Sequence, residues 1–216
     1  MNRRIIILLG LLFLFSCGPF IYFKSPQPIK KSNLSSFPKD LFGSYLSLSD
    51  SSILVIESQK IVKKRFENMV MSFDEYSRET GDTLFRDTTF LFTDNWLINM
   101  KTVGDSIAVK SSRIEDLFAI SNKQILRKYK GYYFLNYQDT NNLWRVELLK
   151  LEKDTLEFGT ILTKEDLEKI KSFTIVESYV DTTELGKSTK YYLNPSKREV
   201  RKILKTRTPG EKFIKK

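Results

Sequence analysis

The stretch from Gly131 to Leu162, GYYFLNYQDTNNLWRVELLKLEKDTLEFGTIL, indicates the fold class. It contains three apolar segments separated by two short polar runs, Asp139–Asn142 and Lys153-Asp154. Alternating apolar and polar residues between turn-forming residues are typical of β-strands with one buried face. Because connections this short cannot form a parallel crossover, consecutive strands here must run antiparallel.

The same pattern continues on both sides of this stretch. It predicts further strands at 42–48, 53–57, 60–66 (extending toward 73), 88–93, 96–103, 107–110, 173–179 and 188–193, and a polar loop at 74–87. Two helices are predicted late in the chain, one after a capping-box pattern at Thr163 and Asp166 and one opened by Asn194 and Pro195. The predicted fold class is mainly β, an antiparallel barrel or sandwich with two short C-terminal helices, while an α+β arrangement stays open.

The composition excludes several kinds of chemistry. The chain has 216 residues, no histidine and a single cysteine, Cys17. It can therefore form neither an intrachain disulfide nor a site that depends on histidine, such as a Ser-His-Asp triad. The nine glycines build no phosphate-binding loop. We expect no cofactor and no metal, and the residues do not support an enzyme.

The N-terminus has the layout of a signal peptide. Arg3 and Arg4 precede an apolar run of 11 residues, Ile5 to Phe15. The sequence Leu14-Phe15-Ser16-Cys17 then resembles the lipobox of a Bacteroidetes-type outer-membrane lipoprotein. This resemblance implies removal of residues 1–16 and lipidation of Cys17, which anchors the protein in the membrane.

The position of the protein follows from the same resemblance. Gly18 follows the cysteine where an inner-membrane retention signal would have Asp, and the next acidic residue is Asp40. The resemblance therefore implies the periplasmic face of the outer membrane. The alternative is an uncleaved transmembrane anchor in the inner membrane, because the 19 residues from Ile5 to Phe23 carry no charge.

Composition divides the mature chain into three parts. Residues 17–38 contain the lipidated cysteine and a tether rich in proline and serine, and residues 39–194 form the β-rich domain, with a subdivision near residue 128. Residues 195–216 are predicted to form a basic helix and a frayed tail.

Residues 187–216 hold 11 Lys and Arg against two Glu. Five basic residues are the candidate contacts for an envelope protein or anionic lipid: Arg198, Arg201, Lys202, Lys205 and Arg207. Nucleic acid is not expected as a partner, because the chain carries an export signal.

An Asp-Ser/Thr tripeptide recurs five times and has two interpretations. Aspartate followed by a β-branched residue is typical of a turn that leads into a strand. The tripeptide also resembles the O-glycosylation acceptor of Bacteroidetes envelope proteins. The candidate acceptors are Thr83, Thr88, Ser106, Thr155 and Thr182.

The aromatic content leaves two functions open. The chain has 16 Phe, 10 Tyr and 2 Trp, which could fill a core or line a cavity. The first hypothesis is a non-enzymatic accessory or docking module of an envelope assembly. The second is a lipocalin-like carrier whose cavity for an apolar ligand is lined by Trp96, Tyr133 and Trp144.

Overall fold

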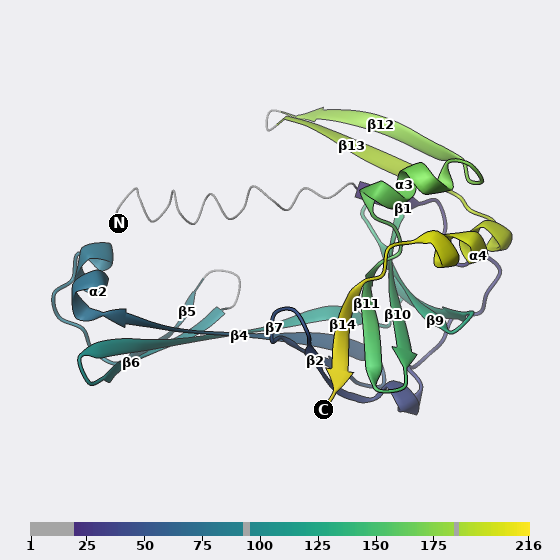
Figure 1. The fold of residues 1–216 in the computed structure, drawn as a ribbon. Helices are drawn as coiled ribbons and strands as arrows, with labels where there is room; N and C mark the ends of the chain where they lie inside the picture. The colour runs from purple at the N-terminus through teal and green to yellow at the C-terminus, as the bar shows by residue number, and fades with distance from the viewer. Residues whose placement is uncertain (1–19, 93–95, 184–185) are drawn as a thin grey trace. The chain divides into compact units, whose positions relative to one another are not determined.

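The computed structural model describes residues 20–92, 96–183 and 186–216 (Figure 1). The chain divides into two compact units. Of the described residues, 63–115 form the smaller unit, and 20–62 together with 116–216 form the larger unit.

The larger unit is a mixed β-sheet with helices late in the chain, which confirms the predicted fold class. Its strands are β1 (Phe20–Phe23), β2 (Gly43–Ser47), β3 (Ile53–Ile56), β8 (Gln124–Tyr129), β9 (Tyr132–Gln138), β10 (Trp144–Glu152), β11 (Thr155–Thr160), β12 (Val176–Thr183), β13 (Gly186–Leu193) and β14 (Glu211–Lys215). Neighbouring strands follow the order β12-β13-β1-β10-β11-β14-β2-β3, and β9 and β8 branch from β10. Among the described strands the pairing stays open rather than closing into a barrel, and β1 pairs with β13 in parallel.

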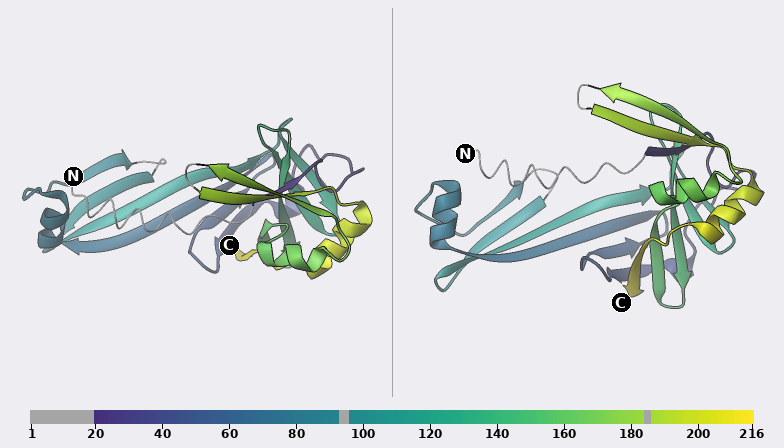
Figure 2. Two further views of the ribbon diagram at one scale, coloured as in Figure 1. Left: turned by 90° about the horizontal axis from the view of Figure 1, so that it is seen from above. Right: turned by 45° about the horizontal axis from the view of Figure 1, so that its top comes forward.

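The two faces of this sheet bury separate apolar clusters, which makes the unit sandwich-like. On β10, Trp144, Val146 and Leu148 face a cluster that includes Leu167 of α3 (Lys164–Ile170) and Val200 of α4 (Lys197–Thr206). Figure 2 shows the two helices side by side against the strands of this unit. The opposite face of β10 contributes Leu149 to the second cluster, with Leu156, Phe213, Tyr45 and Phe37. This division follows from the alternation of side chains along a strand.

Local capping interactions fix where the two helices begin. The predicted capping box of α3 is present: the Thr163 side chain accepts from the Asp166 N–H, and the Asp166 carboxylate accepts from the Thr163 N–H. Helix α4 begins two residues later than Asn194-Pro195 predicted, because Ser196 is its N-cap and forms a capping box with Glu199. A short 3-10 helix, η2 (Lys39–Leu41), precedes β2.

The C-terminal segment is not a frayed tail, so that expectation was wrong. Strand β14 pairs with β11 on one side and β2 on the other, and the Phe213 side chain is completely buried. The chain enters β14 through Gly210, where a Cβ would lie 2.4 Å from the Phe158 carbonyl oxygen. The strand was not recognised from the sequence because it is largely basic and Phe213 is its only buried residue.

The segment after Cys17 is not a free tether, so that expectation was also wrong. Residues 20–23 form β1, and Phe23, Gln27 and Phe37 are buried. The buried Asn136 amide accepts from the Gln27 N–H at 2.5 Å and donates to the Gln27 carbonyl at 2.9 Å. Proline and serine indicated an irregular backbone, but they did not show that this backbone packs against β8 and β9.

The smaller unit is a four-stranded antiparallel sheet with one helix. Strands β4 (Lys60–Ser72), β5 (Thr88–Phe92), β6 (Trp96–Val103) and β7 (Ser106–Ala119) pair in the order β4-β7-β6-β5, and β4 and β7 contribute residues to both units. The turn Gly104-Asp105 joins β6 to β7, with Gly104 at φ 60°, a conformation that glycine adopts readily. Helix α2 (Phe73–Thr80) replaces part of the loop predicted at 74–87. The sequence did not indicate this helix because it has few apolar residues. Two of them, Phe73 and Tyr76, pack against Phe85, with ring centroids 6.1 and 5.2 Å from that of Phe85.

Candidate functional site

One face of the smaller unit exposes an unusual number of large apolar side chains. Leu91 of β5 lies directly opposite Leu97 of β6, and alternation along the strands adds residues of β4, β6 and β7 to this face. We call its six large apolar residues the apolar face: Phe66 (47% exposed), Val70 (69%), Leu91 (73%), Leu97 (44%), Val103 (61%) and Ile114 (65%). The other side of the same sheet buries Ile107 and Val109 and exposes two large apolar residues, Met69 (52%) and Phe90 (39%). Large apolar side chains exposed together on one face of a sheet favour interaction with a protein or a membrane.

A hollow of about 370 Å³ lies within this face. Phe66 and Leu97 supply its apolar lining, and Asn68, Asn99, Lys110, Ser111 and Ser112 complete it. Amide and hydroxyl groups beside apolar side chains can bind both the backbone and the apolar side chains of a polypeptide.

The edge of this sheet is also available for pairing. Strand β5 pairs with β6 on one side, and no other described strand pairs with it. An unpaired edge can accept an additional strand from a partner.

The smaller unit is nearly neutral. Residues 63–115 carry eight basic and nine acidic side chains, so the unit offers little net charge to attract an anionic polymer or surface.

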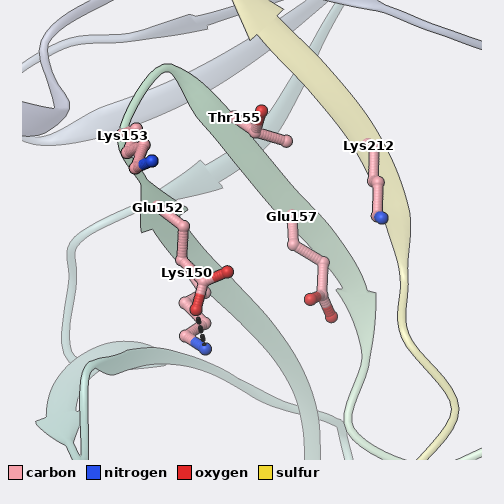
Figure 3. A pocket seen from close by; sticks show the side chains of 6 residues that line it. All are labelled: Lys150, Glu152, Lys153, Thr155, Glu157 and Lys212. Carbon is pink, nitrogen blue, oxygen red and sulfur yellow. Dashed lines mark ion pairs between the residues drawn. The ribbon is translucent and has the colours of Figure 1, made fainter.

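The larger unit has a charged hollow of about 420 Å³ across β10, β11 and β14. Its lining is Lys150, Glu152, Lys153, Thr155, Glu157 and Lys212 (Figure 3). A hydrogen bond between Lys150 and Glu152 raises the pKa of the lysine and lowers that of the glutamate, so both stay charged at neutral pH. Glu157 accepts hydrogen bonds from Arg207 and from the Gly210 N–H. The charged groups of this hollow therefore pair with neighbouring groups of the protein, and this arrangement does not indicate a catalytic acid and base.

The five predicted basic contact residues fall into two groups. Arg198, Arg201, Lys202 and Lys205 lie exposed along α4, and Lys202 stands 5.0 Å above the Phe173 ring. Arg207 instead has a side chain only 4% exposed and forms an ion pair with Glu157. Its guanidinium also donates to the Thr208 carbonyl at 2.9 Å. Arg207 thus joins the end of α4 to β11, and sequence alone could not distinguish it from its neighbours.

The structure does not bring the three predicted cavity residues together. Trp96 lies in β6 of the smaller unit, whereas Tyr133 and Trp144 lie in the larger unit. Within the larger unit Tyr133 packs in the cluster around Leu149, and Trp144 packs in the cluster beneath α3 and α4. Each of these two residues therefore contributes to a different side-chain-filled core.

The five candidate acceptors of sugar differ in their surroundings. Thr83 and Thr88 are exposed, while Ser106 and Thr155 are half-buried directly after the turns Gly104-Asp105 and Lys153-Asp154. Thr182 lies inside β12, where Asp181 pairs with Ser188, so the turn interpretation is wrong for this tripeptide. The side chain of Thr182 and the whole of Cys17 lie outside the part of the structure that is described.

The described residues contain no group of three or more Asp, Glu, Cys or His side chains placed to hold a metal ion. Over the same residues, no helix has the length and apolarity needed to span a bilayer.

Comparison with known proteins adds no family assignment. No protein-family model matches the chain, and searches of curated proteins and of solved structures found no match either.

Proposed function

We propose that this protein is a non-enzymatic, lipid-anchored docking module on the periplasmic face of the outer membrane. In this proposal the lipidated Cys17 fixes the larger unit at the membrane. The smaller unit binds an envelope protein through the apolar face and the free edge of β5. The observation that carries the proposal is the set of six exposed apolar residues on one face of one sheet.

The position of β1 supports lipidation over a retained transmembrane anchor. The uncharged stretch of the alternative anchor runs from Ile5 to Phe23, but its last four residues form β1, and the Phe23 side chain is completely buried. Only 15 residues, 5–19, remain outside that strand. A helix that spans a bilayer needs about 20.

The chemistry of the apolar face supports a protein partner. Its hollow combines the apolar side chains Phe66 and Leu97 with the side-chain amides Asn68 and Asn99. The edge of β5 offers backbone N–H and C=O groups, which pair with an extended peptide. Because the unit is nearly neutral, we expect apolar contact and backbone pairing to dominate recognition, with only weak dependence on salt.

Site-specific photo-crosslinking tests the docking part of this proposal. A photoreactive amino acid is placed at Leu91 of the apolar face, or at Leu84, which is equally exposed (74%) but lies in the loop before β5. In the native envelope, position 91 should give one discrete protein adduct that Leu97→Asp abolishes, and position 84 should not give it. The same adducts from both positions, or no adduct from position 91, would contradict docking at this face.

The anchor is tested separately by intact mass. The mature protein should have the mass of residues 17–216 plus acyl chains. A mass equal to the unprocessed chain would contradict the lipoprotein assignment.

A further inference from the structure

The outward face of β1, β13 and β12 carries a group of tyrosines and lysines. Register places Tyr22 beside Tyr192, and Lys190 beside Tyr179. These side chains lie opposite to Phe23 and Leu193, which are buried, so they point away from the core. The rings of Tyr22 and Tyr192 stack with centroids 5.9 Å apart, and Tyr179 is 61% exposed.

The charges on this face suit a lipid surface. Among the side chains of β12 that the structure describes on this face, the acidic one is Glu177, and Lys24 holds it in an ion pair of 2.8 Å that offsets its negative charge. Lys190 of β13 pairs with Phe20 of β1 on one side and with Tyr179 of β12 on the other. Tyrosine places its ring among acyl chains and its hydroxyl among head groups, and lysine extends its ammonium toward lipid phosphates.

The covalent chain brings this face close to the membrane. Phe20, the first described residue of β1, follows Cys17 by three positions. Three residues span at most about 11 Å even when fully extended. A lipidated Cys17 therefore leaves no length for a spacer between the bilayer surface and β1.

We infer that the outward face of β1, β13 and β12 rests on the lipid head groups around the acylated cysteine. This inference rests on the proposed lipid anchor and adds to it an orientation: the larger unit lies against the bilayer through Tyr22, Tyr179 and Tyr192. The lipid surface is the occupant because Cys17, the proposed anchor point, precedes β1 by only three positions.

Depth-dependent quenching in the full-length lipidated protein tests the orientation. Acylation consumes the only native thiol, so a new cysteine can carry a single environment-sensitive dye. The dye is placed by Tyr179→Cys on the inferred face, by Arg198→Cys on α4 and by Leu48→Cys after β2. Leu48 is 59% exposed, and six strand positions separate β2 from β12, roughly 28 Å along the sheet. The protein is reconstituted in vesicles of phosphatidylethanolamine and phosphatidylglycerol that contain nitroxide-labelled lipid.

The inference predicts quenching several-fold stronger at position 179 than at positions 48 and 198. Equal quenching at 179 and 48 in acylated protein that floats with the vesicles would overturn the orientation but leave the anchor intact. Stronger quenching at 198 would also overturn it and would assign membrane contact to the basic face of α4. A free thiol at Cys17 together with loss of flotation would overturn both the anchor and the inference.

Discussion

The side-chain amide of Asn136 in β9 binds the backbone of Gln27 through both of its polar groups, although 109 positions separate the two residues. The same amide also donates to the Ile125 carbonyl at 3.0 Å. Both residues are completely buried, so these bonds are shielded from water. They hold the segment that follows β1 against the sheet, and they explain why a stretch rich in proline and serine packs as part of the larger unit.

Asn136→Leu should therefore destabilise the larger unit. It leaves the buried Gln27 N–H and C=O without these partners, at a cost of roughly 2–4 kcal/mol. Urea unfolding measures the loss, and limited proteolysis should show earlier cleavage between residues 24 and 38. The control Asn141→Ala changes an exposed residue in the turn before β10 and should stay close to wild type. A variant at 136 as stable as the control would contradict the role of these hydrogen bonds.

Phe213→Ala tests whether β14 belongs to the core. Phe213 is fully buried between β11 and β2, and deleting such a ring costs about 3–5 kcal/mol. Its neighbour Ile214 is 44% exposed on the opposite face of the same strand, so Ile214→Ala should cost far less. Thermal unfolding of the two variants measures the difference. Equal effects would show that β14 does not hold a core position.

Asp166 should make stability depend on pH in acid. Burial by itself raises the pKa of this carboxyl, but hydrogen bonds from the Thr163 and Thr208 backbones and from Lys169 outweigh it and lower the pKa to about 2. Because the folded-state pKa lies below the unfolded value of 3.8, the stabilisation is complete above about pH 4 and is lost as pH falls toward 2. Its size is about 2 kcal/mol.

The corresponding variant is Asp166→Asn, compared with wild type by urea unfolding across this range. The difference in unfolding free energy between the two should shrink as pH falls from 4 to 2. Glu168→Gln, which alters an exposed residue of the same helix, should instead follow the wild-type curve. A constant difference between wild type and Asp166→Asn would contradict the lowered pKa.

The same substitution should destabilise the protein far more at Arg207 than at Arg198. Arg207→Met removes the charged partner of Glu157, whose side chain is only 20% exposed, and we expect a loss of about 2–3 kcal/mol. Arg198→Met alters an exposed position of α4 and should change stability by less than about 0.5 kcal/mol. Chemical denaturation of both variants measures this, and similar effects would contradict the structural assignment of Arg207.

Much of the β-sheet could be predicted because its signals are local. β10 and β11 flank the turn Lys153-Asp154, and the capping box of α3 lies within four consecutive residues, 163–166. β1 and β14 were missed because their partners lie more than 50 positions away, and neither short segment shows an alternating pattern long enough to recognise. Composition then dominated the interpretation, so proline suggested a tether and lysine suggested a tail.

The candidate site was less predictable than the fold. Phe66 and Leu97 have the sequence pattern of core residues, because alternation marks two faces of a strand without showing which face becomes covered. Arg207 belongs to the same basic run as Arg198, and only the position of Glu157 on β11 separates their roles. Tyr22 and Tyr192 are 170 positions apart, so the register of β1 with β13 was needed to place them together.

The sequence by itself determined the mainly β class, the antiparallel meander at 131–162, the two late helices and the absence of histidine chemistry. These depend on turns, caps and composition, which act over a few residues. Only the tertiary structure decided that both ends of the described chain are strands of the sheet, that one arginine is internal, and which apolar face stays uncovered. Those outcomes depend on burial, and burial is set by partners that are distant in sequence.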